Sequence, residues 1–231
     1  MLGRILLSEH VFSSNSLKKL GKYQGDDILQ CRNIILSVFR GYGHTDDYAQ
    51  NAIATDMDDI KKNYLDVKGG HWWVALVDDQ IAGQVGVQPL ALGDPECYQE
   101  ESVTPHYSHI HADQICELRR LGVLSKYQKQ RIGFKLLQTL IGFAQLNEYK
   151  AIHLTTLAQM RSACNFYERC GFISGKVEQH DISLIEQNKI ISVKFATFEE
   201  PSLLTNDDHR LIQLPIQETH KLYVQHYWML I

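Results

Sequence analysis

The 231-residue sequence has no apolar run that approaches the ~18 residues needed for a helix to cross a membrane. It also lacks internal repeats and a sustained heptad pattern, which excludes solenoid, collagen and coiled-coil architectures. An excess of positive charge is missing too, because 23 Lys and Arg face 27 Asp and Glu, for a net charge of −4. Proteins that bind nucleic acids usually carry a basic surface. We therefore expect neither a membrane span nor a nucleic-acid partner.

Cysteine is scarce, with five residues, an odd number, and no Cys-x-x-Cys motif. This pattern does not suggest a disulfide scaffold and favours reduced thiols in the cytoplasm. The first 22 residues hold four basic side chains against one acid, Glu9, and several serines, a composition that resembles an organelle transit peptide. Organelle targeting therefore stays as the alternative location. We expect a leader over 1–25, whose order the sequence leaves open, and a single domain over 26–231.

What is present is the composition of a folded globular protein, with 44% hydrophobic and 22% charged residues. Hydrophobic periodicity predicts helices over 25–38, 45–69, 132–144 and 160–170, the last closed by Gly171. It predicts strands over 72–77, 81–87, 116–124, 151–156, 191–195 and 222–230, and loops over 89–113 and 199–219. This order predicts an α/β (α+β) fold with a central mixed sheet flanked by helices.

The segment from Val123 to Phe134 combines the end of a strand, a polar loop and the start of a helix. The first turn of a helix has unpaired N–H groups and a partial positive charge, which together suit a phosphate. Gly133 has no Cβ, so a ligand could approach the backbone there. The segment has no acidic residue and four nearby basic ones, Lys126, Lys129, Arg131 and Lys135. The alternative is a solvated basic loop, since neither a Walker loop nor Gly-x-Gly-x-x-Gly is present.

Two elements resemble the GNAT acetyltransferase superfamily. Its pyrophosphate loop, Gln/Arg-x-x-Gly-x-Gly/Ala, is similar to the six residues Gln128-Lys129-Gln130-Arg131-Ile132-Gly133, in which Arg131 replaces the first glycine. Its later helix, Asn-x-x-Ala-x-x-Phe/Leu-Tyr-x-x-x-Gly-Phe, is similar to 160–172, in which Met160 replaces the Asn. The resemblance covers 114–173 and extends to the 72–88 hairpin. The stretch from Asn147 to Glu168 is most similar to camello-like N-acetyltransferases.

The resemblance implies a GNAT-like acyl-CoA N-acyltransferase fold. It also implies an enzyme that moves the acetyl group of acetyl-CoA, a co-substrate, to an amine by direct attack in a ternary complex, without a metal. The amine acceptor, whether a small molecule, a peptide or a protein, is left open, as is a homodimer. The residues that would bind the cofactor are Leu121, Gly122, Val123, Gln128, Lys129, Gln130, Arg131, Ile132, Gly133, Phe134, Lys135 and Asn165.

Two residues are candidates for catalysis. Glu117 stands where some GNAT enzymes carry a glutamate that acts as a general base, and strand alternation predicts that it shares a face with Arg119, Leu121 and Val123. A structural ion pair of Glu117 with Arg119 or Arg120 is the alternative.

Tyr167 is the candidate general acid for the leaving thiolate, because the resemblance implies that this helix tyrosine points at the sulfur. A core tyrosine is the alternative. At the level of the whole protein, a catalytically silent domain that binds acyl-CoA is the second hypothesis, and a nucleotide-phosphate binder is the third.

Overall fold

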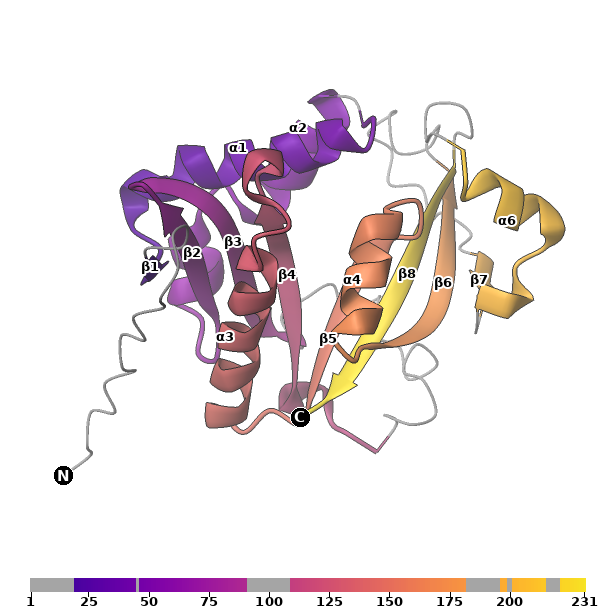
Figure 1. Ribbon diagram of the computed structural model, residues 1–231. Coiled ribbons are helices and arrows are strands. Elements are labelled where there is room, and N and C mark those ends of the chain that lie inside the picture. Colours follow the sequence, from indigo (N-terminus) through magenta and orange to yellow (C-terminus); the bar gives the residue numbers. More distant parts are fainter. Residues whose placement is uncertain (1–18, 45, 91–108, 182–195, 199–200, 215–220) are drawn as a thin grey trace.

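The structure is a computed structural model that describes residues 19–44, 46–90, 109–181, 196–198, 201–214 and 221–231 (Figure 1). Its strands are β1 (Lys19–Lys22), β2 (His71–Val77), β3 (Gln80–Pro89), β4 (Ile115–Val123), β5 (Ala151–Leu157), β6 (Ile173–Asp181), β7 (Ala196–Phe198) and β8 (Lys221–Leu230). Its α-helices are α1 (Ile28–Gly41), α2 (Asp46–Asp56), α3 (Ile132–Leu146), α4 (Arg161–Arg169) and α6 (Asn206–Leu211). Short helical turns are η1 (Gly25–Asp27), η2 (Lys61–Leu65), η6 (Ala112–Gln114), η7 (Ser125–Tyr127) and η8 (Pro201–Leu203).

The strands form one mixed sheet in the order β1-β2-β3-β4-β5-β8-β6-β7. Neighbouring strands run antiparallel except β4 and β5, which are parallel. The predicted α/β class with a central mixed sheet is confirmed. The last strand, β8, pairs with β5 on one side and β6 on the other, so it lies inside the sheet.

Helices cover both faces of the sheet (Figure 1). Helices α3 and α4 pack on one face, and α1 and α2 pack on the opposite face of the β1–β4 half. Strand β2 shows how the sequence produces this, because Trp72 and Val74 face α1 whereas Trp73 and Ala75 face α3. Apolar side chains on both faces are typical of a sheet buried on both sides.

The second predicted helix is shorter than expected. Helix α2 ends at Asp56, and a separate turn, η2, begins at Lys61. The break comes from two aspartates: Asp58 accepts a hydrogen bond from the N–H of Asp59 (2.9 Å), and Asp59 accepts one from the N–H of Lys62 (2.9 Å). Such side-chain-to-backbone bonds compete with a continuous helix and begin a new one. The predicted apolar face is nevertheless fully buried, at Ile53, Met57, Ile60 and Tyr64.

The hairpin, the β4 strand and helices α1, α3 and α4 lie where the sequence predicts them. Gly171 follows the C-cap Cys170 with φ +92°, the left-handed conformation that glycine adopts without strain. Strand β1 lies inside the predicted leader and pairs with β2. The rest of the leader, 1–18, falls outside the described residues, so the division at residue 25 stays a prediction.

The C-terminal third differs most from expectation. The strand β6 was not predicted, and the predicted strand over 191–195 falls outside the described residues. The expected loop over 199–219 contains helix α6, which begins with a capping box: the N–H of Asp208 donates to the Thr205 hydroxyl, and the N–H of Thr205 donates to the Asp208 carboxylate. This reciprocal pair satisfies two backbone donors and starts the helix.

Candidate active site

The sheet opens at its centre, between β4 and β5. These strands pair only at Ile115–Ala151, Cys116–Ile152 and Glu117–His153. Beyond Glu117, no register pair in the described chain joins them, and they diverge like the arms of a V, with α3 beside one arm and α4 beside the other (Figure 1). A pocket of about 150 Å³ lies in this opening, lined by Leu118, Arg119, Arg120 and Thr155. The inner edge of β4 therefore has backbone groups available to a ligand.

A β-bulge shapes the β4 arm. Gly86 of β3 pairs with Arg119, but two residues earlier on β3, Gln84 pairs with Gly122, so β4 carries one extra residue. Arg120 sits in the bulge with φ +55°. A bulge bends the strand and changes the side on which later side chains point.

The bulge overturns one prediction. Glu117 and Arg119 face the α1–α2 side, where Arg119 comes within 3.7 Å of Asp56, but Leu121 and Val123 pack into the core on the α3–α4 side. The expectation that all four β4 residues share a face is therefore wrong. Simple alternation fails because the extra residue shifts the period by one.

Glu117 lies at the base of the opening and is only 2% exposed. Both of its carboxylate oxygens are 3.3 Å from Nη1 of Arg119, and Oε1 is 3.8 Å from Nδ1 of His153. Burial disfavours the charge of Arg119, yet the attraction of Glu117 outweighs it and raises the pKa of the guanidinium above its usual value. The predicted Glu117–Arg119 pair is therefore present. Whether Glu117 also acts as a base stays a prediction.

Arg120 takes a different partner, Asp56, at the end of α2. Nε of Arg120 donates to both oxygens of the Asp56 carboxylate (3.0 and 3.1 Å). The Tyr64 hydroxyl also donates to the Asp56 carboxylate. Burial would raise the pKa of Asp56, but the positive charges of Arg120 and Arg119 hold it below its usual value. The predicted alternative of a Glu117–Arg120 pair is not formed. Instead, Arg120 ties helix α2 to the bulge.

The predicted phosphate loop joins β4 to α3 as expected. Lys129 and Arg131 have φ values of +60° and +61°, and Arg131 is the N-cap of α3. The left-handed conformation at Arg131 explains the glycine of the family pattern, since glycine avoids the cost of about 1 kcal/mol that a side chain has there. Two glutamine amides brace the loop: Gln128 donates to the Val123 carbonyl (3.1 Å) and Gln130 to the Lys126 carbonyl (3.4 Å).

The other residues predicted to bind the cofactor lie around this loop. Lys129 and Arg131 are exposed, as is Phe134, at 42%. A Cβ at Gly133 would be in ordinary contact with Val123 and Phe166, at 3.7–3.9 Å, so space alone does not require glycine there. The positions with intermediate or full burial are Leu121, Gly122, Val123, Ile132, Gly133 and Lys135. Asn165 is exposed on α4. Their roles stay predictions.

Tyr167 points from α4 into the core on the α3–α4 side and is 6% exposed. Its ring contacts those of Phe166, Phe172 and Tyr227, with centroid distances of 5.5, 5.7 and 5.9 Å. Burial, with the thiols of Cys164 and Cys170 nearby, raises its pKa, so the hydroxyl is protonated at neutral pH. Within the described residues that hydroxyl has no hydrogen-bond partner, which leaves its proton available to a ligand.

Glu117 and Tyr167 therefore lie on opposite faces of the sheet. Cys116 and Leu118, the neighbours of Glu117, belong to the same core cluster as Tyr167, so the carboxylate points away from it. The two candidate catalytic groups do not contact each other. A group held in the opening between β4 and β5 would be reached from one face by Glu117 and from the other by α4.

The polar neighbours of Glu117 are not among the predicted site residues. His153 and His226, 1% and 3% exposed, lie on β5 and β8 with Nε2 of the first 3.0 Å from Nδ1 of the second. His226 occupies an inward position in a strand that alternates Leu222, Val224, His226 and Trp228. A histidine in an otherwise apolar alternation is the signal that could have identified it.

No group of three or more His, Cys, Asp or Glu residues within the described ranges is arranged to hold a metal ion. In the same part of the chain, no helix has the length and apolarity that crossing a bilayer would need.

Comparison with known proteins gives a family match over 39–172, to the acetyltransferase (GNAT) family. The chain is 35% identical over 130 residues to a probable N-acetyltransferase camello of Xenopus tropicalis, which covers 56% of this chain and 51% of that protein. It is 33% identical over 131 residues to an N-acetylaspartate synthetase of the same species, a match that covers 57% of this chain and 41% of that protein. It is 29% identical to human N-acetyltransferase 8, a match that covers 54% of this chain and 48% of that protein. The chain thus spans about half the length of the curated relatives it matches. The resemblance to camello-like proteins is confirmed.

Solved structures confirm the fold. An acetyltransferase from Streptococcus agalactiae superposes with a TM-score of 0.55 at 15% identity, covering 92% of this chain and 98% of that one. An acetyltransferase of the GNAT family from Staphylococcus aureus gives a TM-score of 0.52 at 23% identity, covering 68% and 83%.

Proposed function

Because this chain belongs to the acetyltransferase (GNAT) family, we propose that it transfers the acetyl group of acetyl-CoA to the nitrogen of an amine. The opening between β4 and β5, beside the loop that starts α3, is the observation that carries this proposal. It offers an unpaired strand edge to an extended, amide-containing chain and a helix N-terminus to a diphosphate. These two features fit the pantetheine arm and the diphosphate of coenzyme A.

The residues that would hold the co-substrate follow from this placement. The backbone of Leu121, Gly122 and Val123 would pair with the amide groups of the pantetheine arm, and the first-turn N–H groups of α3, from Ile132, would bind the diphosphate. Lys129 and Arg131 would add positive charge at the exposed end of the loop.

The reaction would be a direct attack in a ternary complex. The amine nitrogen forms a bond to the acetyl carbonyl carbon and the carbon–sulfur bond breaks. The nitrogen then gives up a second proton, which the departing thiolate takes, so coenzyme A leaves as the free thiol. Before attack, the amine must lose a proton, and Glu117 is the carboxylate at the base of the opening that can accept it.

Tyr167 would act on the thiolate from the α3–α4 side. Because burial raises its pKa, its hydroxyl favours donating a hydrogen bond to the sulfur over complete transfer of the proton. Glu117 would then act on the amine from one face of the sheet and Tyr167 on the thiolate from the other. This arrangement suits a reaction in which the amine attacks as the thiolate leaves.

The test is thiol release from acetyl-CoA across a panel of small amines, amino acids and peptides, with mass detection of the acetylated product. We expect coenzyme A to stabilise the protein thermally and at least one amine to release thiol. Lys129→Glu should raise the KM for acetyl-CoA about tenfold, one decade being about 1.4 kcal/mol, whereas Lys62→Glu, an equally exposed change on η2, should leave it unchanged.

The second candidate function is a domain that binds acyl-CoA without catalysis. The contact of Arg119 with both oxygens of Glu117 favours it, because the guanidinium occupies the acceptor oxygens that a base would offer to the amine. Stabilisation by coenzyme A without thiol release on the whole panel would establish this candidate. Stabilisation by ATP but not by coenzyme A would overturn both.

A further inference from the structure

A line of polar side chains runs from Glu117 across the sheet to β6. Glu117, His153 and His226 share one face: Glu117 is the register partner of His153, and His226 is the partner of Thr155, two residues along β5. Glu178 of β6 follows, with Oε1 3.4 Å from Nε2 of His226. Thr155 lines the pocket of the opening, so the line begins beside the candidate site.

We propose that Glu117, His153, His226 and Glu178 form a buried relay that carries the proton of the acceptor amine away from the site. This inference rests on the proposed function, since the relay has a purpose only if an amine is deprotonated at Glu117. His153 and His226 are positioning residues because they act through Glu117.

The distances and the burial support this order of transfer. Nε2 of His153 and Nδ1 of His226 are 3.0 Å apart, within hydrogen-bond distance, so one ring nitrogen must donate and the other accept. The contact of Glu117 with Nδ1 of His153 is 3.8 Å, so the carboxyl group must approach by about 1 Å to transfer a proton. The relay leaves the protein at β6, where the side chains of Glu178 and His180 are 12% and 21% exposed.

Burial and the surrounding charges keep His153 neutral and Glu178 ionised, the protonation states that the relay needs. Burial, with His226, Lys176 and Arg119 nearby, lowers the pKa of His153 well below its usual value, so this ring is neutral and has one donor and one acceptor nitrogen. Burial opposes the charge of Glu178, but His180, His226 and Lys176 hold its pKa below the usual range. Glu178 therefore stays ionised and can stabilise a positive charge on His226.

One proton passes through the relay per turnover, and the second proton that the nitrogen loses goes to the departing sulfur. The acceptor ammonium gives a proton to Glu117, which passes it to Nδ1 of His153. Nε2 of His153 gives its own proton to Nδ1 of His226, which becomes an imidazolium opposite Glu178. The proton on Nε2 of His226 then leaves to solvent past Glu178. Each ring then carries its proton on Nδ1, and the starting tautomers return between turnovers by proton exchange with water, at Glu178 for one end of the relay and at Glu117 in the open site for the other.

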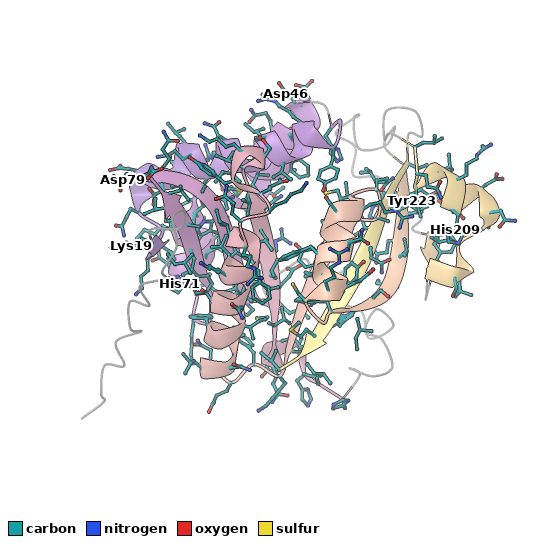
Figure 2. All side chains as sticks on the ribbon, viewed as in Figure 1. Lys19, Asp46, His71, Asp79, His209 and Tyr223 are labelled. Carbon is teal, nitrogen blue, oxygen red and sulfur yellow. The ribbon has the colours of Figure 1, made fainter. Side chains whose placement is uncertain are left out.

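The kinetic test uses His153→Gln and His226→Gln, because an amide can hydrogen-bond but cannot pass a proton. At pH 7 with an alkylamine, kcat should fall about tenfold or more, with the roughly 10²–10⁴-fold effect of general acid–base catalysis as the upper bound. The loss should shrink as pH rises toward 10, where the amine is already neutral, and the KM for acetyl-CoA should not change. The control is His71→Gln on β2, in the other half of the sheet (Figure 2), which should keep kcat at every pH.

A second measurement does not depend on turnover. In protein labelled with ¹⁵N-histidine, Glu117→Gln should shift the ring resonances of His153 and, through it, of His226. If only His153 responds, or if both Gln variants keep kcat within twofold of the His71→Gln control, the relay is overturned while the transferase stands. A loss of kcat that does not depend on pH also overturns it, as a purely structural role. If the unmodified protein releases no thiol with any amine, the proposed function fails and the relay fails with it.

Discussion

At the scale of single residues, the hydroxyl of Tyr167 has the most specific expected role. It is buried, protonated and without a partner among the described residues, and its ring is fixed by Phe166, Phe172 and Tyr227. A phenylalanine would keep the ring contacts and remove only the donor, so the substitution separates packing from chemistry.

Tyr167→Phe is expected to lower kcat about 10- to 100-fold, up to the lower limit of the range for acid–base groups because the hydroxyl only donates a hydrogen bond, without changing thermal stabilisation by coenzyme A. Steady-state kinetics with the best amine of the panel measures this. Tyr149→Phe is the matched control, because its hydroxyl donates to the Gly69 carbonyl (3.1 Å) outside the site. An unchanged kcat in Tyr167→Phe would leave this tyrosine with a packing role only.

Residue-level predictions succeeded where the local pattern was sufficient. The pairing of Glu117 with Arg119 follows from strand spacing, and the N-cap position of Arg131 follows from the loop pattern. The contacts of Arg120 with Asp56 and of His153 with His226 join residues 64 and 73 positions apart. Only the folded sheet brings such residues together, so a single sequence gives no direct signal for these pairs.

At the scale of elements, helix α6 shows how a few polar groups decide local structure. The hydroxyl of Thr205 bonds to the N–H and carboxylate of Asp208, whose other oxygen accepts a hydrogen bond from Tyr223 (2.7 Å), a residue labelled in Figure 2. The cap thus connects α6 to β8. The sequence signal, a threonine three residues before an acid, was present within the expected loop.

Thr205→Ala is expected to lower the free energy of unfolding by about 1 kcal/mol, the usual effect of losing an N-cap. Asp208→Ala should have a larger effect because it also leaves the Tyr223 hydroxyl without its acceptor. Urea denaturation of both variants, with Gln213→Ala as an exposed control nearby, measures the difference. Equal stability of Thr205→Ala and the unmodified protein would contradict the capping role.

Elements with a clear period were predicted well, and those without one were not. Strands β2 and β3 and helix α3 combine apolar periodicity with recognisable ends. Strand β6 carries Lys176, Glu178 and His180 on or near its buried face, so its alternation is masked by charged residues that pair inside the protein. The bulge at Arg120 follows from contacts between β3 and β4, which strand alternation alone does not reveal.

At the scale of the whole molecule, buried histidines link folding to pH. Burial lowers the pKa of His44, near α1, to about 4, and burial with nearby Lys22 lowers that of His71, on β2, to about 4. In the unfolded chain a histidine has a pKa of about 6.5, so the unfolded state binds protons first as pH falls. Stability from these groups is therefore complete above about pH 6.5 and declines toward pH 4.

The free energy of unfolding is expected to fall by roughly 2–4 kcal/mol between pH 7 and pH 4, after a discount for partial exposure. Asp56 and Glu178, whose pKa values are lowered, act in a separate window, because stability from ionised carboxylates is lost only below about pH 4. Urea denaturation at four pH values measures the slope. His44→Gln should flatten it, and an unchanged slope would show that His44 does not contribute.

The short ladder between β4 and β5 has a mechanical consequence. The strands on each side of this ladder form a four-stranded plate, and antiparallel ladders hold each plate together. One plate consists of β1, β2, β3 and β4, and the other consists of β5, β8, β6 and β7. Among the described residues, three register pairs, at Ile115–Glu117, join the two plates. Widening the gap about these pairs would break none of the ladders, but it would separate the core cluster that joins Leu118 of β4 to Leu154 of β5 and Tyr227 of β8. The width of the opening between β4 and β5 is therefore set by the side chains that fill it. Substitutions of these side chains are expected to change that width.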